Sequence, residues 1–230
     1  MNFPTSKSYT RLAGVLYLLI ALLGFFSIGY APTVLFIPGD AATNAQSILN
    51  HQGLFRITLF SDILIIIIEM LLTVVLYNMF KAVNNTVAKV ALYSRLAMSF
   101  IMAINLLNYF MPLHLLSGDY QTSIDQSQSL ALLFLDAHQD GVLIWGIFFG
   151  LHLTALGYMV YRSGFVPKVL GVLLLLGSFG YTIESVAAFT LPDSLLLSYL
   201  SMGLLGFAVI GELSFAIWLM TRKRNSIGIL

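Results

Sequence analysis

The stretch FLDAHQDG, residues 134–141, places Asp136, His138 and Asp140 at alternate positions just before a long apolar run. In an extended chain all three side chains would point one way and could hold a metal ion together. In a helix Asp136 and Asp140 lie together, whereas His138 is turned about 200° away. The preceding periodicity favours a helix, so a divalent metal such as zinc would need further ligands from neighbouring segments at about 2.0–2.2 Å. The candidate metal ligands are Asp136, His138, His114 and Asp62.

A second group consists of two carboxylates and one guanidinium inside apolar runs. At 1.5 Å per residue, Glu69, Arg95 and Glu212 reach a similar depth, with Arg95 about 10 Å from the surface of the apolar layer. An ionisable group at mid-bilayer costs roughly 2.5–3.5 kcal/mol, so each needs a partner or a purpose. A salt-bridged triad would neutralise all three charges as a structural staple. The alternative is a proton or ion relay, in which the second carboxylate has no partner and titrates.

A third group of polar residues falls in the other half of the apolar layer. These groups would not be tolerated facing lipid, so we expect them either to line an outward-opening cavity or to hydrogen-bond between helices. The candidate ligand-binding residues are Asp62, Asn105, Asn108, His138 and Glu184. The four histidines are also expected at or beyond the midplane on that side: His51, His114, His138 and His152.

The elements that carry these residues are predicted from composition. Of the 230 residues, 59% are hydrophobic and only 9% are charged, too few charges to cover a soluble domain. There is no cysteine, so thiolate metal sites are excluded, and the few basic residues form no nucleic-acid footprint. Each long apolar run must be a helix, because unpaired backbone groups cannot face lipid. We predict an all-α, polytopic membrane protein, a single six-helix transmembrane domain over 1–230 with spans at about 11–31, 57–80, 88–113, 141–162, 167–190 and 198–221.

The orientation follows from the basic residues. With the N-terminus in the cytoplasm, ten of the eleven lie at the inner side and only Arg56 lies outside, which predicts that both termini are cytoplasmic. The two long loops, about 32–56 and 114–140, then lie outside and are expected to carry short surface helices. One follows Asp40 as its cap, and the other ends before a break at Gly141. The ten inner residues are Lys7, Arg11, Lys81, Lys89, Arg95, Arg162, Lys168, Arg222, Lys223 and Arg224.

Several short segments together resemble one known family. They are LFLDAH (133–138), FFGLH (148–152), GYMVYRSG (157–164) and VPKVLG (166–171), with PGDAA (38–42) and LFR (54–56). In these the chain is similar to the bacterial domain-of-unknown-function 4386 family over nearly its whole length. The resemblance implies a six-helix protein of the bacterial cytoplasmic (inner) membrane. It implies no catalytic role for any residue.

Three functions are compatible with these patterns. The first is a membrane protein whose outward-facing polar cavity binds a small ligand or ion, as in a proton-coupled transporter. The second is a metal-dependent hydrolase that acts on a lipid or another amphiphile at the outer leaflet. The third is a non-catalytic sensor or assembly subunit whose histidines respond to outside pH. The expected partners are the lipid bilayer and a small molecule or ion; a homo-oligomer is compatible with the sequence.

Overall fold

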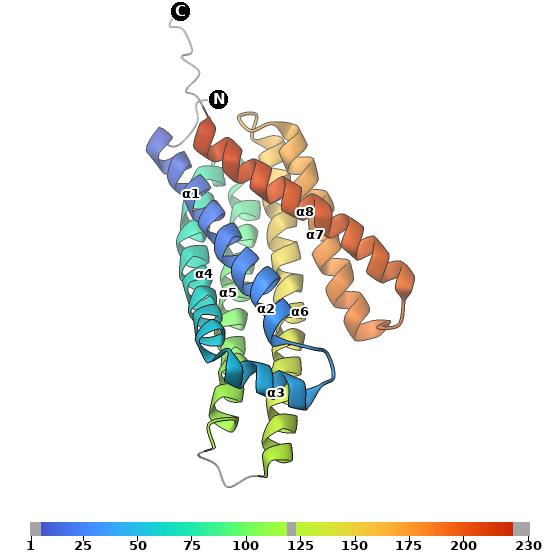
Figure 1. The fold of residues 1–230 in the computed structure, drawn as a ribbon. Helices are drawn as coiled ribbons and strands as arrows, with labels where there is room; N and C mark the ends of the chain where they lie inside the picture. The colour runs from blue at the N-terminus through green and yellow to red at the C-terminus, as the bar shows by residue number, and fades with distance from the viewer. Residues whose placement is uncertain (1–5, 119–122, 223–230) are drawn as a thin grey trace, which may run out of the picture.

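The computed structural model describes residues 6–118 and 123–222, and this part of the chain is helical (Figure 1). Six long apolar helices could each cross a membrane, which confirms the predicted all-helical architecture. Lys223 and Arg224 lie outside the described residues. The elements are α1 (Lys7–Gly24), the π-helix η1 (Phe25–Tyr30), α2 (Ala31–Leu35), α3 (Ala41–Asn50), α4 (Gln52–Phe80), α5 (Asn85–Leu115), α6 (Ile124–Arg162), α7 (Lys168–Thr190) and α8 (Leu195–Thr221).

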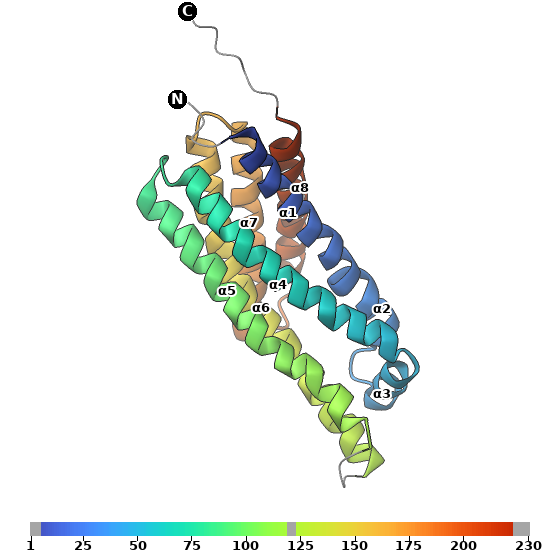
Figure 2. The same ribbon diagram turned by 90° about the vertical axis from the view of Figure 1, so that its left-hand side faces the viewer.

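The long helices are arranged as a closed ring. Each packs on its neighbour in the sequence, and α8 returns to pack on α1 (Figures 1 and 2). The start of α1 and the end of α8 lie at one end of the bundle, which we call the terminal end. At the opposite, distal end, α3 packs across α6, and the α5–α6 hairpin extends furthest (Figures 1 and 2).

The core of the ring is apolar and is built by all six long helices. Leu72, Met98, Leu153, Leu174 and Phe215 are among its buried side chains. A second apolar cluster fills the distal end beneath α3. Buried polar groups inside such a bundle therefore have to find partners on neighbouring helices.

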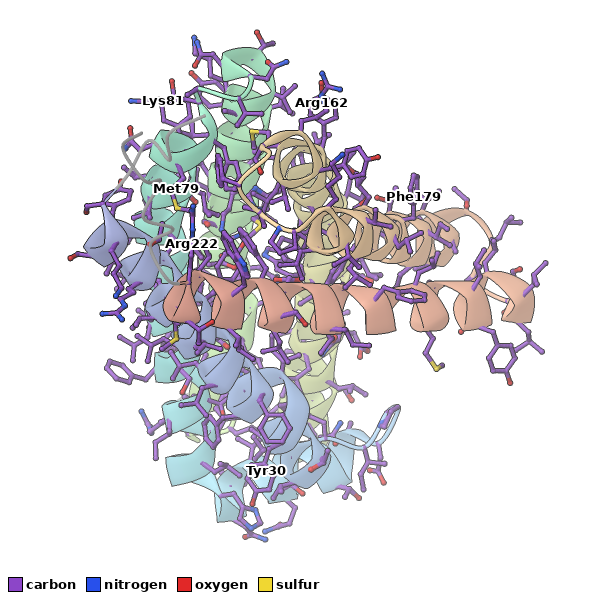
Figure 3. The ribbon with its side chains drawn as sticks, turned by 90° about the horizontal axis from the view of Figure 1, so that it is seen from above. Tyr30, Met79, Lys81, Arg162, Phe179 and Arg222 are labelled. Carbon is purple, nitrogen blue, oxygen red and sulfur yellow. The ribbon has the colours of Figure 1, made fainter. Side chains whose placement is uncertain are left out.

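The α7–α8 hairpin leans sideways from the other helices toward its connecting loop (Figures 1 and 3). Phe179 of α7 lies on this projecting part, whereas Arg222 lies near the middle of the terminal end (Figure 3). Near the ring, α6 and α7 approach closely at Gly150, where a Cβ would meet the Thr182 hydroxyl at 2.5 Å and Ser178 O at 3.0 Å. Gly146 and Gly150, four residues apart on α6, thus let these two backbones approach closely.

The helix α6 is longer than the sequence predicts. It begins at Ile124, because Ser123 and Gln126 form a capping box, and it continues without a break to Arg162. The predicted break at Gly141 and the separate surface helix before it are therefore wrong. A glycine inside a helix costs about 1 kcal/mol of stability relative to alanine. At Gly141 the close contact with the Asn105 side chain of α5 offsets this cost.

The other predicted surface helix is present as α3. The Asp40 carboxylate accepts hydrogen bonds from the Thr43 backbone N–H (2.8 Å) and hydroxyl (2.7 Å) and so caps it. The Asn44 side chain holds the preceding turn through the backbone N–H (2.6 Å) and carbonyl (3.0 Å) of Ile37. With Ala45 and Ile48 buried, α3 covers the distal end of the bundle.

Candidate functional site

Arg95 lies at the centre of the first candidate site. Its side chain comes from α5 and is only 1% exposed. One guanidinium nitrogen, Nη1, donates to His152 Nε2 on α6 at 2.9 Å, and His152 Nδ1 lies 2.8 Å from the Ala91 carbonyl. Because a carbonyl and a guanidinium can only accept and donate respectively, these contacts assign the proton to Nδ1 and make His152 a neutral imidazole. His152 is thus a fixed acceptor for Arg95.

Aromatic rings enclose the guanidinium. Arg95 Cζ lies 5.3 Å from the centre of the Tyr17 ring of α1 and 5.9 Å from that of Phe149 of α6. Phe149 in turn stacks on His152, with ring centres 6.1 Å apart. Such ring faces attract a desolvated cation by about 2 kcal/mol. The protein therefore holds a permanent positive charge in the middle of the bundle.

Two carboxylates interact electrostatically with this charge. Glu69 of α4 and Glu212 of α8 both interact electrostatically with Arg95, and Glu69 also acts on Glu212. Glu69 is 4% exposed, and its Oε2 accepts from the Ser99 hydroxyl at 3.3 Å. In the described part of the chain, the hydrogen bond that Arg95 donates from its side chain goes to His152 and not to a carboxylate. We call Glu69, Arg95, His152 and Glu212 the charged core.

Two buried donors of this region form no hydrogen bond of standard geometry among the described residues. They are Arg95 Nε and the Tyr17 hydroxyl, although Tyr17 and Arg95 interact with each other. A cavity of about 10 Å³ also lies beside His152, between α4, α5 and α6, and is lined further by Thr73, Ala91 and Met159. This is about the room that one water molecule needs. The charged core therefore combines unsatisfied donors with water-sized space.

A second polar group lies toward the distal end. The Asn105 side chain donates to the His138 carbonyl at 2.8 Å, and His138 Nδ1 lies 3.3 Å from the Asn105 carbonyl. Asn108 donates to Asn105 Oδ1 at 3.1 Å. A Cβ at Gly141 would overlap the Asn105 amide, so this contact between α5 and α6 requires glycine. The Tyr109 ring stacks on His138 with ring centres 4.5 Å apart.

Asp62 of α4 joins this group through Tyr109. The carboxyl interacts electrostatically with Tyr109 and faces Ser27 of η1. We call Asp62, Asn105, Asn108 and His138 the distal polar group. Glu184, by contrast, is exposed on α7, where it acts on Tyr181 of the same helix. The structure thus brings together four of the five expected ligand-binding residues and leaves Glu184 apart.

The four expected metal ligands do not converge. Asp136 and Asp140 are exposed on α6, whereas His138 is buried, as helical geometry requires. His114 is exposed in the last turn of α5. Within residues 6–118 and 123–222, no three His, Asp or Glu side chains are placed to hold a metal ion.

The pairing of His152 with Arg95 was not predicted. From the sequence, His152 was expected at or beyond the midplane, with no link to Arg95. A simple count would have found the pairing. His152 precedes the terminal end of α6 at Arg162 by ten residues, and Arg95 follows the start of α5 at Asn85 by ten. At equal rise per residue, both side chains must then lie at the same depth.

The six apolar helices define a multi-pass membrane protein. The chain belongs to the family described as Domain of unknown function (DUF4386), which it matches over residues 12–222. It is also similar to a protein of Archaeoglobus fulgidus named Uncharacterized protein, with 40% identity over 80 residues. That match covers 34% of this chain and 44% of the relative, so the chain aligns with less than half of the relative's length. No solved structure matches the chain.

Proposed function

We propose that this protein binds a small ligand or ion between its helices and couples the binding to movement of a proton, as a proton-coupled transporter does. The observation that carries the proposal is the charge count of the charged core. One guanidinium, which stays protonated, compensates one carboxylate, but Glu69 and Glu212 both interact electrostatically with it. His152 adds no charge, because both of its nitrogens are already engaged. The second carboxyl therefore carries a proton that it can exchange.

The positions of the charged core and the distal polar group support coupling between ligand binding and proton movement. Asp62 and Glu69 are seven residues apart on α4, which is nearly two turns, so they share one face about 10 Å apart. The cavity beside His152 lies next to the charged core and offers water-sized room for proton exchange. A ligand at the distal polar group and a proton at the charged core would thus act on the same helix.

The proposed orientation of the protein in the membrane follows from its basic side chains. Lys7, Lys81, Lys89, Arg162 and Lys168 are exposed at or near the terminal ends of their helices, which would face the cytoplasm. The distal polar group would then take its ligand from the outer side. Binding is favoured over metal-dependent hydrolysis, because the residues expected to hold a metal lie apart.

The test is electrical and needs no known ligand. The protein is reconstituted in liposomes on a solid-supported membrane, and the transient current that follows a rapid pH step is recorded. We expect a charge displacement in the wild type that Glu69→Gln and Glu212→Gln each abolish, whereas Glu184→Gln, the exposed control on α7, retains it. An unchanged current in correctly folded Glu69→Gln protein would contradict proton exchange at the charged core.

A further inference from the structure

The first membrane span contains a π-helical turn whose residues point to a separate site. At Phe25–Tyr30 the helix widens, and the Ala31 backbone N–H bonds to the Phe26 carbonyl, five residues back. Pro32 accounts for this turn, because it has no N–H and its ring would clash with the carbonyl four residues earlier in a regular α-helix. Single π-helical turns occur frequently at functional sites.

This turn leaves Ser27 with two oxygens that can coordinate a ligand. Its carbonyl loses both usual helical donors, since the Ala31 N–H is used by Phe26 and Pro32 has none. Its side-chain hydroxyl is buried, the residue being 3% exposed, and interacts with the Asp62 carboxyl without forming a hydrogen bond of standard geometry to any described residue. A buried hydroxyl that lacks a well-formed hydrogen bond costs up to about 1–3 kcal/mol, so a ligand that coordinates it is favoured.

The Ser27 hydroxyl lies beside a carboxylate on α4, the next long helix. Asp62 of α4 lies beside it, where α4 packs on η1. Among the described residues, the polar groups that act on Asp62 are Ser27 and Tyr109, and neither carries a positive charge. An isolated carboxylate within the apolar layer requires a compensating cation or proton.

We propose that Asp62 and Ser27 form a sodium site at the π-helical turn of the first span. The Asp62 carboxylate, the Ser27 hydroxyl and the Ser27 carbonyl are hard oxygen ligands. Backbone carbonyls released by an irregular helix are a recurring way to coordinate Na⁺ in membrane proteins. One carboxylate balances a monovalent ion and leaves the pair neutral, whereas a divalent ion would leave an excess positive charge among apolar side chains.

This inference rests on the proposed function in one respect, since Asp62 belongs to the distal polar group and sodium would be the ion bound there. It does not depend on the proton proposed at the charged core, because it involves different residues of α4 and η1. There are two alternative explanations. The Ser27 hydroxyl could donate a direct hydrogen bond to Asp62 after a small side-chain rotation, or Asp62 could carry a proton. Both alternatives satisfy the same groups without an ion and predict no binding of sodium.

The experiment measures equilibrium binding of radiolabelled Na⁺ to the purified full-length protein, with choline chloride keeping the ionic strength constant. We expect saturable binding of one ion per chain. Asp62→Asn should abolish it, and Ser27→Ala should weaken it about tenfold, since a neutral ligand contributes less than the charge. Asp136→Asn, which changes an exposed carboxylate of α6, should bind as the wild type does.

Thermal unfolding in NaCl and in choline chloride provides the second measurement. A bound ion stabilises the folded state in a concentration-dependent way, so sodium should raise Tm in the wild type and not in Asp62→Asn. Ser27→Ala removes a single oxygen and keeps the fold testable should Asp62→Asn fail to fold. Absence of saturable sodium binding in the wild type, or undiminished binding in folded Ser27→Ala and Asp62→Asn, would overturn the proposal.

Discussion

Removal of the central positive charge should destabilise the protein in a way that depends on pH. In Arg95→Met the hydrogen bond to His152 is lost, and neither Glu69 nor Glu212 retains a compensating charge. The carboxylate that was ionised beside Arg95 must then take up a proton on folding. The fold can form, but only with one more bound proton than the wild type.

The magnitude follows from that extra proton. At pH 7 a carboxyl of ordinary Glu pKa, about 4.3, is about 2.7 pH units from half-protonation, and each unit is worth about 1.36 kcal/mol. The protonation alone therefore costs about 3.7 kcal/mol, close to the roughly 3–5 kcal/mol measured when one member of a buried ion pair is removed. Because folding of the variant takes up one additional proton, this loss of stability should fall by about 2.7 kcal/mol between pH 7 and pH 5.

Unfolding by SDS titration in mixed micelles measures this difference in the free energy of unfolding at the two pH values. Adding Glu69→Gln to Arg95→Met removes one of the two carboxyls and should restore most of the stability at pH 7. Arg162→Met, at an exposed position on α6, should change the stability by no more than about 0.5 kcal/mol. A loss in Arg95→Met that is the same at both pH values, or that Glu69→Gln does not relieve, would refute the charge count.

Two further predictions concern the distal end. Gly141→Ala places a Cβ against the Asn105 amide and should destabilise the protein by about 1–3 kcal/mol in the same SDS titration, whereas Gly203→Ala, which meets nothing within 4 Å, should have little effect. At the cap of α3, the hydrogen bonds from the backbone N–H and hydroxyl of Thr43 lower the pKa of Asp40 below its usual value. The stability that this cap contributes is therefore present above the ordinary Asp range and is lost as pH falls through the lowered value. Hydrogen exchange of the α3 amides should report that loss in the wild type and not in Asp40→Ala, and an identical pH response in the two proteins would exclude the cap as its cause.

The architecture was predictable because the membrane allows so few solutions. Apolar runs of sufficient length must be helices, so six runs give six spans, and the one-sided distribution of lysine and arginine predicts an orientation. Depth was also predictable from a residue count. Glu69, Arg95 and Glu212 were therefore expected at one level before the helices were placed relative to each other.

Contacts between helices were harder to predict, because they depend on the rotation of each helix about its own axis. Arg95 donates to His152, 57 residues further along the chain, whereas the sequence predicted a carboxylate as its partner. Gly141 suggested a break, whereas it is a contact point that only the position of Asn105 explains. Glu184 was expected at the depth of the distal polar group, but it is exposed on α7.

The π-helical turn could have been recognised in the sequence. Pro32 lies near the end of a long apolar run, where a proline must disturb the helical hydrogen bonds four or five residues earlier. That position is Ser27, the buried polar residue of the turn. A proline late in a transmembrane run, with a serine five residues before it, indicates where a carbonyl and a hydroxyl become available together.

The central claim is that Glu69 and Glu212 share Arg95 and that one of the two is protonated. Infrared spectroscopy of the protein in lipid, in sodium-containing buffer at neutral pH, tests it through the C=O stretch of a protonated carboxylic acid. The wild type should show this band, with the isotope shift expected in D₂O, and both Glu69→Gln and Glu212→Gln should lose it, because the remaining carboxylate then pairs with Arg95 alone. A wild-type spectrum without the band, or a band that persists in both variants, would contradict the account.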